Sequence, residues 1–201
     1  MTTPEKRIYL ASRSPRRRDL LKQIGIPFEV LLLRDHPGRN VDVDESHMPG
    51  EKPDDYVRRV ARMKADAGWE RVLQRKLPRF PVLAADTVVA VDDTILGKPL
   101  DTANAVTMLR LLSGREHRVL TSVAITLDQR IELVVSESRV RFAELSDADI
   151  EAYVASGEPN DKAGGYAVQG RAQAFITELH GSHSGVMGLP LHETTELLKK
   201  F

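Results

Sequence analysis

The first apolar run of the chain, residues 8–11, has four residues and is typical of a short buried strand. A polar break follows it, in which Ser14 and Pro15 are a favourable N-cap and first helical residue. Apolar residues then recur at helical spacing until Gly25, which suits the position just after a helix. The pattern predicts a strand, a tight loop and a helix, with a second strand over residues 28–33.

A loop over residues 34–53, rich in proline, glycine and acidic residues, precedes a predicted helix over residues 53–68. Lys64 stands on the apolar face of this helix, so its ammonium group either extends to the surface or meets a buried anion. Residues 80–91 are the most apolar run of the chain and predict a central strand buried on both faces. Asp86 stands in the middle of that run.

The rest of the chain continues to mix helical and strand patterns. They predict a helix over residues 102–112, paired strands over 119–127 and 131–142, a helix from a capping-box-like start at Ser146 to about Gly157, and a helix over 191–198. The segment around His180 and His183 does not look helical, and these two histidines without a third ligand do not favour a zinc site. Because strands and helices intermix without a repeat, we expect one α/β domain over residues 1–201, in two lobes around one sheet.

Composition excludes several classes of protein. The 29 basic and 29 acidic residues balance, which gives no general attraction to nucleic acid or to an anionic membrane. The absence of cysteine excludes disulfides, iron–sulfur clusters and thiol catalysis. The N-terminus lacks an apolar signal-peptide core, and no run approaches the roughly 18 apolar residues of a membrane span. We therefore expect a soluble cytoplasmic protein that binds neither nucleic acid stably nor a membrane.

Charge is nevertheless uneven along the chain, with a basic excess over residues 6–22 and an acidic excess over residues 41–55. Such runs are most often solvated faces. The alternative interpretation is a single site that binds an anion together with a divalent cation.

The break between the first strand and helix carries groups suited to an anion. A helix N-terminus presents unpaired N–H groups and a partial positive charge. Ser12, Ser14, Arg16 and Arg17 add hydroxyl and guanidinium donors that fit phosphate. The phosphate-binding pattern of P-loop proteins occurs nowhere in the chain. The alternative is a capped helix with a basic, exposed face.

Asp86 is a second candidate, because an ionised carboxylate in an apolar strand is costly unless it is paired or binds a metal. The alternative is that it lies at a strand end and caps a turn. Glu45 could supply a second carboxylate, and oxygen ligands of this kind suit Mg²⁺. Lys98 and Lys162 are each more often ordinary surface lysines when taken singly, and Lys64 joins them as a third. Together with the arginines they would form a cationic pocket facing two acids, which suits phosphoryl chemistry.

Nine segments, taken in order, resemble the Maf family of nucleoside triphosphate pyrophosphatases. They lie at residues 10–17, 61–65, 85–89, 97–99, 113–117, 156–159, 161–166, 168–170 and 186–191. The resemblance implies an elongated mixed β-sheet flanked by helices, in two lobes with a central cleft, as in inosine triphosphatases. It also implies a homodimer and the hydrolysis of a nucleoside triphosphate to a monophosphate and pyrophosphate, with Mg²⁺, or else Mn²⁺ or Co²⁺.

The same resemblance implies roles for ten residues. Asp86 would accept the proton of the attacking water and, with Glu45, would hold the metal. The triphosphate would lie against Ser12, Arg16, Arg17, Lys64, Lys98 and Lys162, of which Lys64 and Lys98 join the two acids as catalytic residues. Arg16, Thr87 and Gln169 would read the base, and they match the branch that acts on dTTP and UTP.

The resemblance leaves alternatives open. The same reaction on 7-methyl-GTP, on modified pyrimidine nucleotides or on another non-standard nucleotide is one, and a nucleotide-binding regulator of cell division is another. The loop before Glu45 is longer than the family pattern suggests, so Asp44 remains a second choice for that acid. Ser122 replaces a common glycine, and residues 171–173 replace a glycine-rich step close to Gln169.

Overall fold

The computed structural model describes residues 7–34 and 41–201. Lys6 of the basic run, the rest of the N-terminal segment and residues 35–40 of the predicted loop lie outside the described residues. The elements are β1 (Ile8–Leu10), α1 (Pro15–Gln23), β2 (Phe28–Val30), α2 (Pro53–Gln74), β3 (Val82–Val91), β4 (Thr94–Leu96), α3 (Thr102–Leu112), β5 (Glu116–Leu127), β6 (Arg130–Phe142), α4 (Asp147–Ala155), the 3₁₀ turns η1 (Ala163–Gly165) and η2 (Arg171–Phe175), β7 (Ile176–His180), α5 (His183–Met187) and α6 (Leu191–Leu198).

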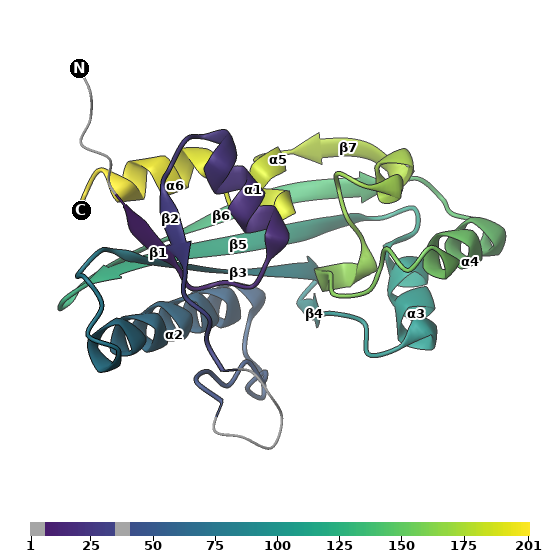
Figure 1. Cartoon of the computed structure of the whole chain (residues 1–201). Helices are drawn as coiled ribbons and strands as arrows, with labels where there is room; N and C mark the ends of the chain where they lie inside the picture. Colours follow the sequence, from purple (N-terminus) through teal and green to yellow (C-terminus); the bar gives the residue numbers. More distant parts are fainter. Residues whose placement is uncertain (1–6, 35–40) are drawn as a thin grey trace.

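Seven strands form one mixed sheet in the order β2-β1-β3-β5-β6-β7, with β4 beside β3. The pairs of β1 with β2 and with β3 are parallel, and the other pairs are antiparallel. α2 covers one face of the sheet, α1 and α6 lie on the other, and α3 and α4 lie at the far end (Figure 1). The predicted α/β fold with an elongated mixed sheet is confirmed.

The edge of β3 that faces β1 is interrupted, and this creates the cleft. β1 pairs with β3 only at Val82 and Leu83, whereas β4 pairs with it from Val89 onward. Alternate residues of a strand turn their N–H and C=O groups to the same edge. Within the described residues, Ala85 and Thr87 therefore face the gap without a backbone partner.

The apolar side chains divide between the two sides of this gap. Leu109 and Leu112 of α3 pack with Phe142 and Tyr153 in the lobe that holds α3 and α4. In the other lobe, α1 and α6 pack on one face of β1, β3 and β5, and α2 packs on the opposite face. The predicted arrangement of two lobes around one sheet is confirmed.

Several predictions about individual elements are wrong. α2 continues past Gly68 to Gln74, because Trp69 and Val72 extend its buried face. Gly68 does not end the helix. It allows the helix to approach the sheet, since a Cβ there would lie 2.7 Å from a methyl group of Val82.

The prediction that the segment around His180 and His183 is not helical is also wrong. α5 begins at His183, and the hydroxyl of its N-cap Ser182 accepts the N–H of Gly185 at 3.0 Å. β2 ends at Val30, earlier than residue 33, and the short strands β4 and β7 were not predicted. Within the described residues, no helix combines the length and the hydrophobicity needed to cross a lipid bilayer.

His117 on β5 is a buried histidine that should make stability depend on pH. It is 2% exposed, packs against the rings of Phe142 and Tyr166, and its Nε2 lies 2.9 Å from the Tyr166 hydroxyl. Burial lowers the pKa of His117 from 6.5 to about 4. The neutral form is favoured in the folded state, so this stabilisation is complete above pH 6.5 and is lost as the pH falls toward 4.

We expect the His117 contribution to lower the free energy of unfolding by about 3 kcal/mol between pH 7 and pH 4. Urea unfolding of the protein and of His117→Gln across this range measures it. His180, an exposed histidine, provides the control substitution His180→Gln for the loss of an imidazole outside the core. If His117→Gln loses stability on acidification as steeply as the unmodified protein, the attribution to His117 is wrong.

Candidate active site

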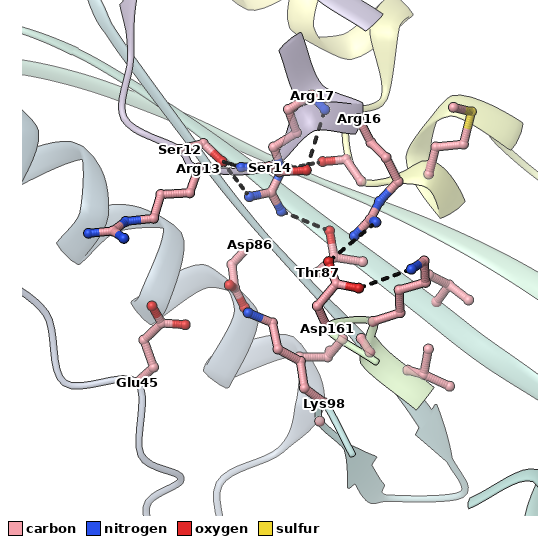
Figure 2. A pocket seen from close by; sticks show the side chains of 18 of the residues that line it. Ser12, Arg13, Ser14, Arg16, Arg17, Glu45, Asp86, Thr87, Lys98 and Asp161 are labelled. Atoms are coloured by element: carbon pink, nitrogen blue, oxygen red, sulfur yellow. Dashed lines mark hydrogen bonds and ion pairs between the residues drawn. The ribbon is translucent and has the colours of Figure 1, made fainter. Parts of the chain in front are cut away.

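A cavity of about 440 Å³ lies at the gap in β3, between the two lobes. All ten residues singled out in the sequence line it: Ser12, Arg16, Arg17, Glu45, Lys64, Asp86, Thr87, Lys98, Lys162 and Gln169. Asp86 and Thr87 are neighbours on β3 and point to opposite faces of the sheet. Because the adjacent edge is open, both side chains reach the cavity (Figure 2).

Lys64 joins the two carboxylates. Its Nζ lies 2.8 Å from Oδ1 of Asp86 and 2.9 Å from Oε2 of Glu45. α2 therefore turns this lysine toward a buried anion, which decides between the two sequence interpretations of its apolar position. The Tyr56 hydroxyl, also on α2, donates to the Glu45 carbonyl at 2.9 Å and fixes the backbone beside that acid. Asp44 accepts the N–H of Ser46 at 2.9 Å, so Glu45 rather than Asp44 reaches the cavity.

Arg17, at the start of α1, ties three segments together. The Ser14 hydroxyl caps the helix by accepting the Arg17 N–H at 3.4 Å. The guanidinium then donates from Nε to the Gly188 carbonyl at 2.7 Å, from Nη1 to Ser12 at 3.3 Å and from Nη2 to Thr87 at 3.1 Å. Burial lowers the pKa of Arg17, and the nearby Asp86 opposes that shift. An arginine stays charged in proteins. The three hydrogen bonds use three of the five N–H groups of the guanidinium, so two remain to bind an anion.

The remaining cations singled out in the sequence are Arg16, also on α1, and the two lysines Lys98 and Lys162 of the lobe that holds α3 and α4. Asp161 lies 3.0 Å from Lys162 and 4.0 Å from Arg16, so it holds both side chains at the cavity (Figure 2). Within the described part of the chain, Lys98 makes no hydrogen bond or ion pair, and its ammonium group is available to a ligand. Gln169 lies at the rim and is exposed.

The family model for Maf-like proteins matches residues 7–201. The chain belongs to the Maf-like family.

Maf-like relatives cover nearly the whole chain. A protein of Nitrosomonas europaea named dTTP/UTP pyrophosphatase is 56% identical over 193 residues, which are 96% of this chain and 93% of that protein. One of Dechloromonas aromatica with the same name is 55% identical over 194 residues, 96% of each chain. The solved structure of the Staphylococcus aureus Ham1 protein is similar over 97% of this chain and 99% of that one, with 14% identity and a TM-score of 0.49.

Sequence reasoning missed three residues that line this Maf-like cavity or contact its lining. Tyr56 and Asp161 bind predicted site residues, and Thr121 lies directly opposite Thr87 in the pairing of β3 with β5. Asp161 adjoins the predicted site residue Lys162 in the sequence, and this adjacency could have identified it as a partner of that lysine. The register between β3 and β5 cannot be read from the sequence, so nothing there could connect Thr121 with Thr87.

The two carboxylates of the Maf-like cavity suit a divalent cation. Oxygens of Glu45 and Asp86 lie within hydrogen-bonding distance of one nitrogen, that of Lys64. The described residues contain no group of three or more acidic, histidine or cysteine side chains placed to hold a metal. Mg²⁺ is commonly bound by only one or two carboxylates, with water and substrate phosphates as its other ligands. The donor set therefore fits a cation that arrives together with a triphosphate.

Proposed function

We propose that the protein hydrolyses dTTP and UTP, and modified pyrimidine nucleotides of the same shape, to the monophosphate and pyrophosphate. The observation that carries this proposal is the pair of carboxylates at Lys64 in a cavity that is also lined by Arg16, Arg17, Lys98 and Lys162. The cations of such a cavity can neutralise the charge of a triphosphate. One of the carboxylates can then act as a general base beside the phosphorus atoms. The choice of base rests on relatives named dTTP/UTP pyrophosphatase.

Each group then has a chemical task. Arg16, Arg17, Lys98 and Lys162 bind the triphosphate and oppose the charge that develops on the departing pyrophosphate. Asp86 uses one oxygen to accept from Lys64, and its second oxygen accepts a proton from the water that attacks the α-phosphorus. The bond between the α-phosphorus and its bridging oxygen breaks, and pyrophosphate leaves. A divalent cation held by Asp86 and Glu45, which we propose to be Mg²⁺, would supply further charge neutralisation. We also keep two proposals: a homodimer, from the family resemblance, and a cytoplasmic location, from the composition of the chain.

The proposal predicts pyrophosphate release from dTTP and UTP in the presence of Mg²⁺. Pyrophosphate and orthophosphate are assayed separately with dTTP, UTP, CTP, ATP, GTP and 7-methyl-GTP, and each reaction is repeated with EDTA. We expect pyrophosphate mainly from dTTP and UTP, and none with EDTA, because the triphosphate would then lack its cation. Release from 7-methyl-GTP instead would keep the reaction and contradict the assigned base. Orthophosphate alone, or no turnover of any nucleotide, would contradict the proposed function.

A further inference from the structure

A directed chain of hydrogen bonds runs from Thr87, which lines the cavity, to buried groups behind it. Thr121 is fully buried on β5, and its hydroxyl donates to the Gly185 carbonyl at 2.7 Å. The same oxygen lies 2.9 Å from the Thr87 hydroxyl. A carbonyl can only accept, so the single hydrogen of Thr121 is committed to Gly185. The bond between the two threonines therefore has one direction: Thr87 donates and Thr121 accepts.

This direction fixes what Thr87 can offer a ligand. Its hydrogen goes to Thr121, and one of its two lone pairs accepts from Nη2 of Arg17 at 3.1 Å. One lone pair remains, so Thr87 can accept a hydrogen bond but cannot donate one.

Ser12 has the opposite polarity in the same cavity. Its hydroxyl oxygen accepts from the Ser14 N–H at 3.2 Å and from Nη1 of Arg17 at 3.3 Å. Both lone pairs are used and its hydrogen is uncommitted, so Ser12 can donate to a ligand. Phosphate oxygens are acceptors. The phosphates therefore suit Ser12 and the cations, whereas the group that reaches Thr87 must carry a hydrogen.

We propose that Thr121 is a positioning residue for base selection, which fixes Thr87 as an acceptor for the N3–H of uracil or thymine. The inference rests on the proposed function and deepens it. Cytosine has an unprotonated N3, which would place a lone pair against that of Thr87 and leave both without a partner. A buried polar group without a partner is strongly disfavoured, so this single contact separates the two bases.

The test measures binding without turnover. The dissociation constants of the α,β-imido analogues of UTP and CTP are determined by calorimetry with the unmodified protein, Thr121→Val and Thr121→Ser. The unmodified protein should bind the uridine analogue at least about tenfold more tightly than the cytidine analogue. In Thr121→Val the Thr87 hydrogen is released and can be donated to N3 of cytosine. The cytidine analogue should then bind about tenfold more tightly, with little change for the uridine analogue. Thr121→Ser keeps the hydroxyl and should keep the selectivity.

A matched control lies on the same strand. Thr126 is also buried, and its hydroxyl donates to the Arg130 carbonyl at 3.2 Å, but neither of these residues lines the cavity, whereas Thr121 bonds to Thr87, which does. Thr126→Val should leave the ratio of the two dissociation constants unchanged. If Thr121 had a purely structural role, Thr121→Val would weaken the binding of both analogues equally. The ratio of their dissociation constants would then stay unchanged, which would overturn the proposal.

The remaining outcomes separate this inference from the proposed function. Equal binding of the two analogues by the unmodified protein, or no binding, overturns the inference. If the ratio of the dissociation constants shifts in Thr121→Val although the unmodified protein releases no pyrophosphate from UTP, that outcome supports the inference and contradicts the proposed function. Release of pyrophosphate with an unshifted ratio contradicts only the inference.

Discussion

Replacing Asp86 with asparagine should lower the rate of pyrophosphate release by about 10²–10⁴-fold, the range of a positioned general base. The amide has nearly the shape of the carboxylate and can still accept from Nζ of Lys64 through its oxygen. It has no basic oxygen to accept the proton of the attacking water. Lys64 also keeps its ion pair with Glu45, so no buried ammonium group is left without a partner. The loss should therefore appear in kcat, with nucleotide binding retained.

The comparison needs a carboxylate outside the cavity. Asp128, in the turn between β5 and β6, is exposed and pairs with Arg79 at 3.0 Å. Its backbone has a positive φ of 53°, which asparagine also adopts readily. Asp128→Asn should therefore keep full activity. Asp86→Asn retaining more than about a tenth of the rate would mean that another group accepts the proton, since a positioned base contributes far more than that.

The sequence located the cavity better than it explained its geometry. Asp86 and Lys64 drew attention because each is a charged residue among apolar ones, and such a charge is costly without a partner. The structure shows that each is the partner of the other. Pairing across β3 and β5 depends on the register of strands that lie far apart in sequence, so Thr121 carried no signal of its own.

The features of the fold also divide into those that local sequence predicts and those that depend on tertiary packing. Local chemistry identified the capped starts of α1 and α4, because Ser14 and Ser146 each accept a hydrogen bond from the first turn. The boundaries that depend on tertiary packing were missed. Gly68 reads as a helix end in isolation, but α2 needs a residue without a side chain where it crosses Val82. The gap in β3 also has no local signature, because it depends on where β1 ends and β4 begins.

Gly164→Ala should destabilise the protein by about 2–4 kcal/mol and raise the KM for the nucleotide. Gly164 has a φ of +68°, which disfavours any residue with a Cβ. A Cβ there would also lie 2.8–3.0 Å from three side-chain atoms of Val89, near the end of β3, where β4 pairs with it. The Gly164 N–H donates to the Gly97 carbonyl at 3.0 Å and so joins the loops that carry Lys98 and Lys162. Displacing η1 should therefore move both lysines.

Gly25→Ala separates the two causes. Gly25 has the same φ of +68°, and nothing lies within 4 Å of a Cβ built on it. Its substitution should cost only the backbone part, about 1 kcal/mol, and should leave KM unchanged. The difference between the two variants in urea unfolding then measures the collision with Val89. Val89→Ala removes two of the three close atoms, so the double variant Gly164→Ala, Val89→Ala should lose less stability than the two single losses combined, by about 1 kcal/mol. Strictly additive losses would place the cost of Gly164→Ala in the backbone alone and contradict the contact between η1 and β3 as its cause.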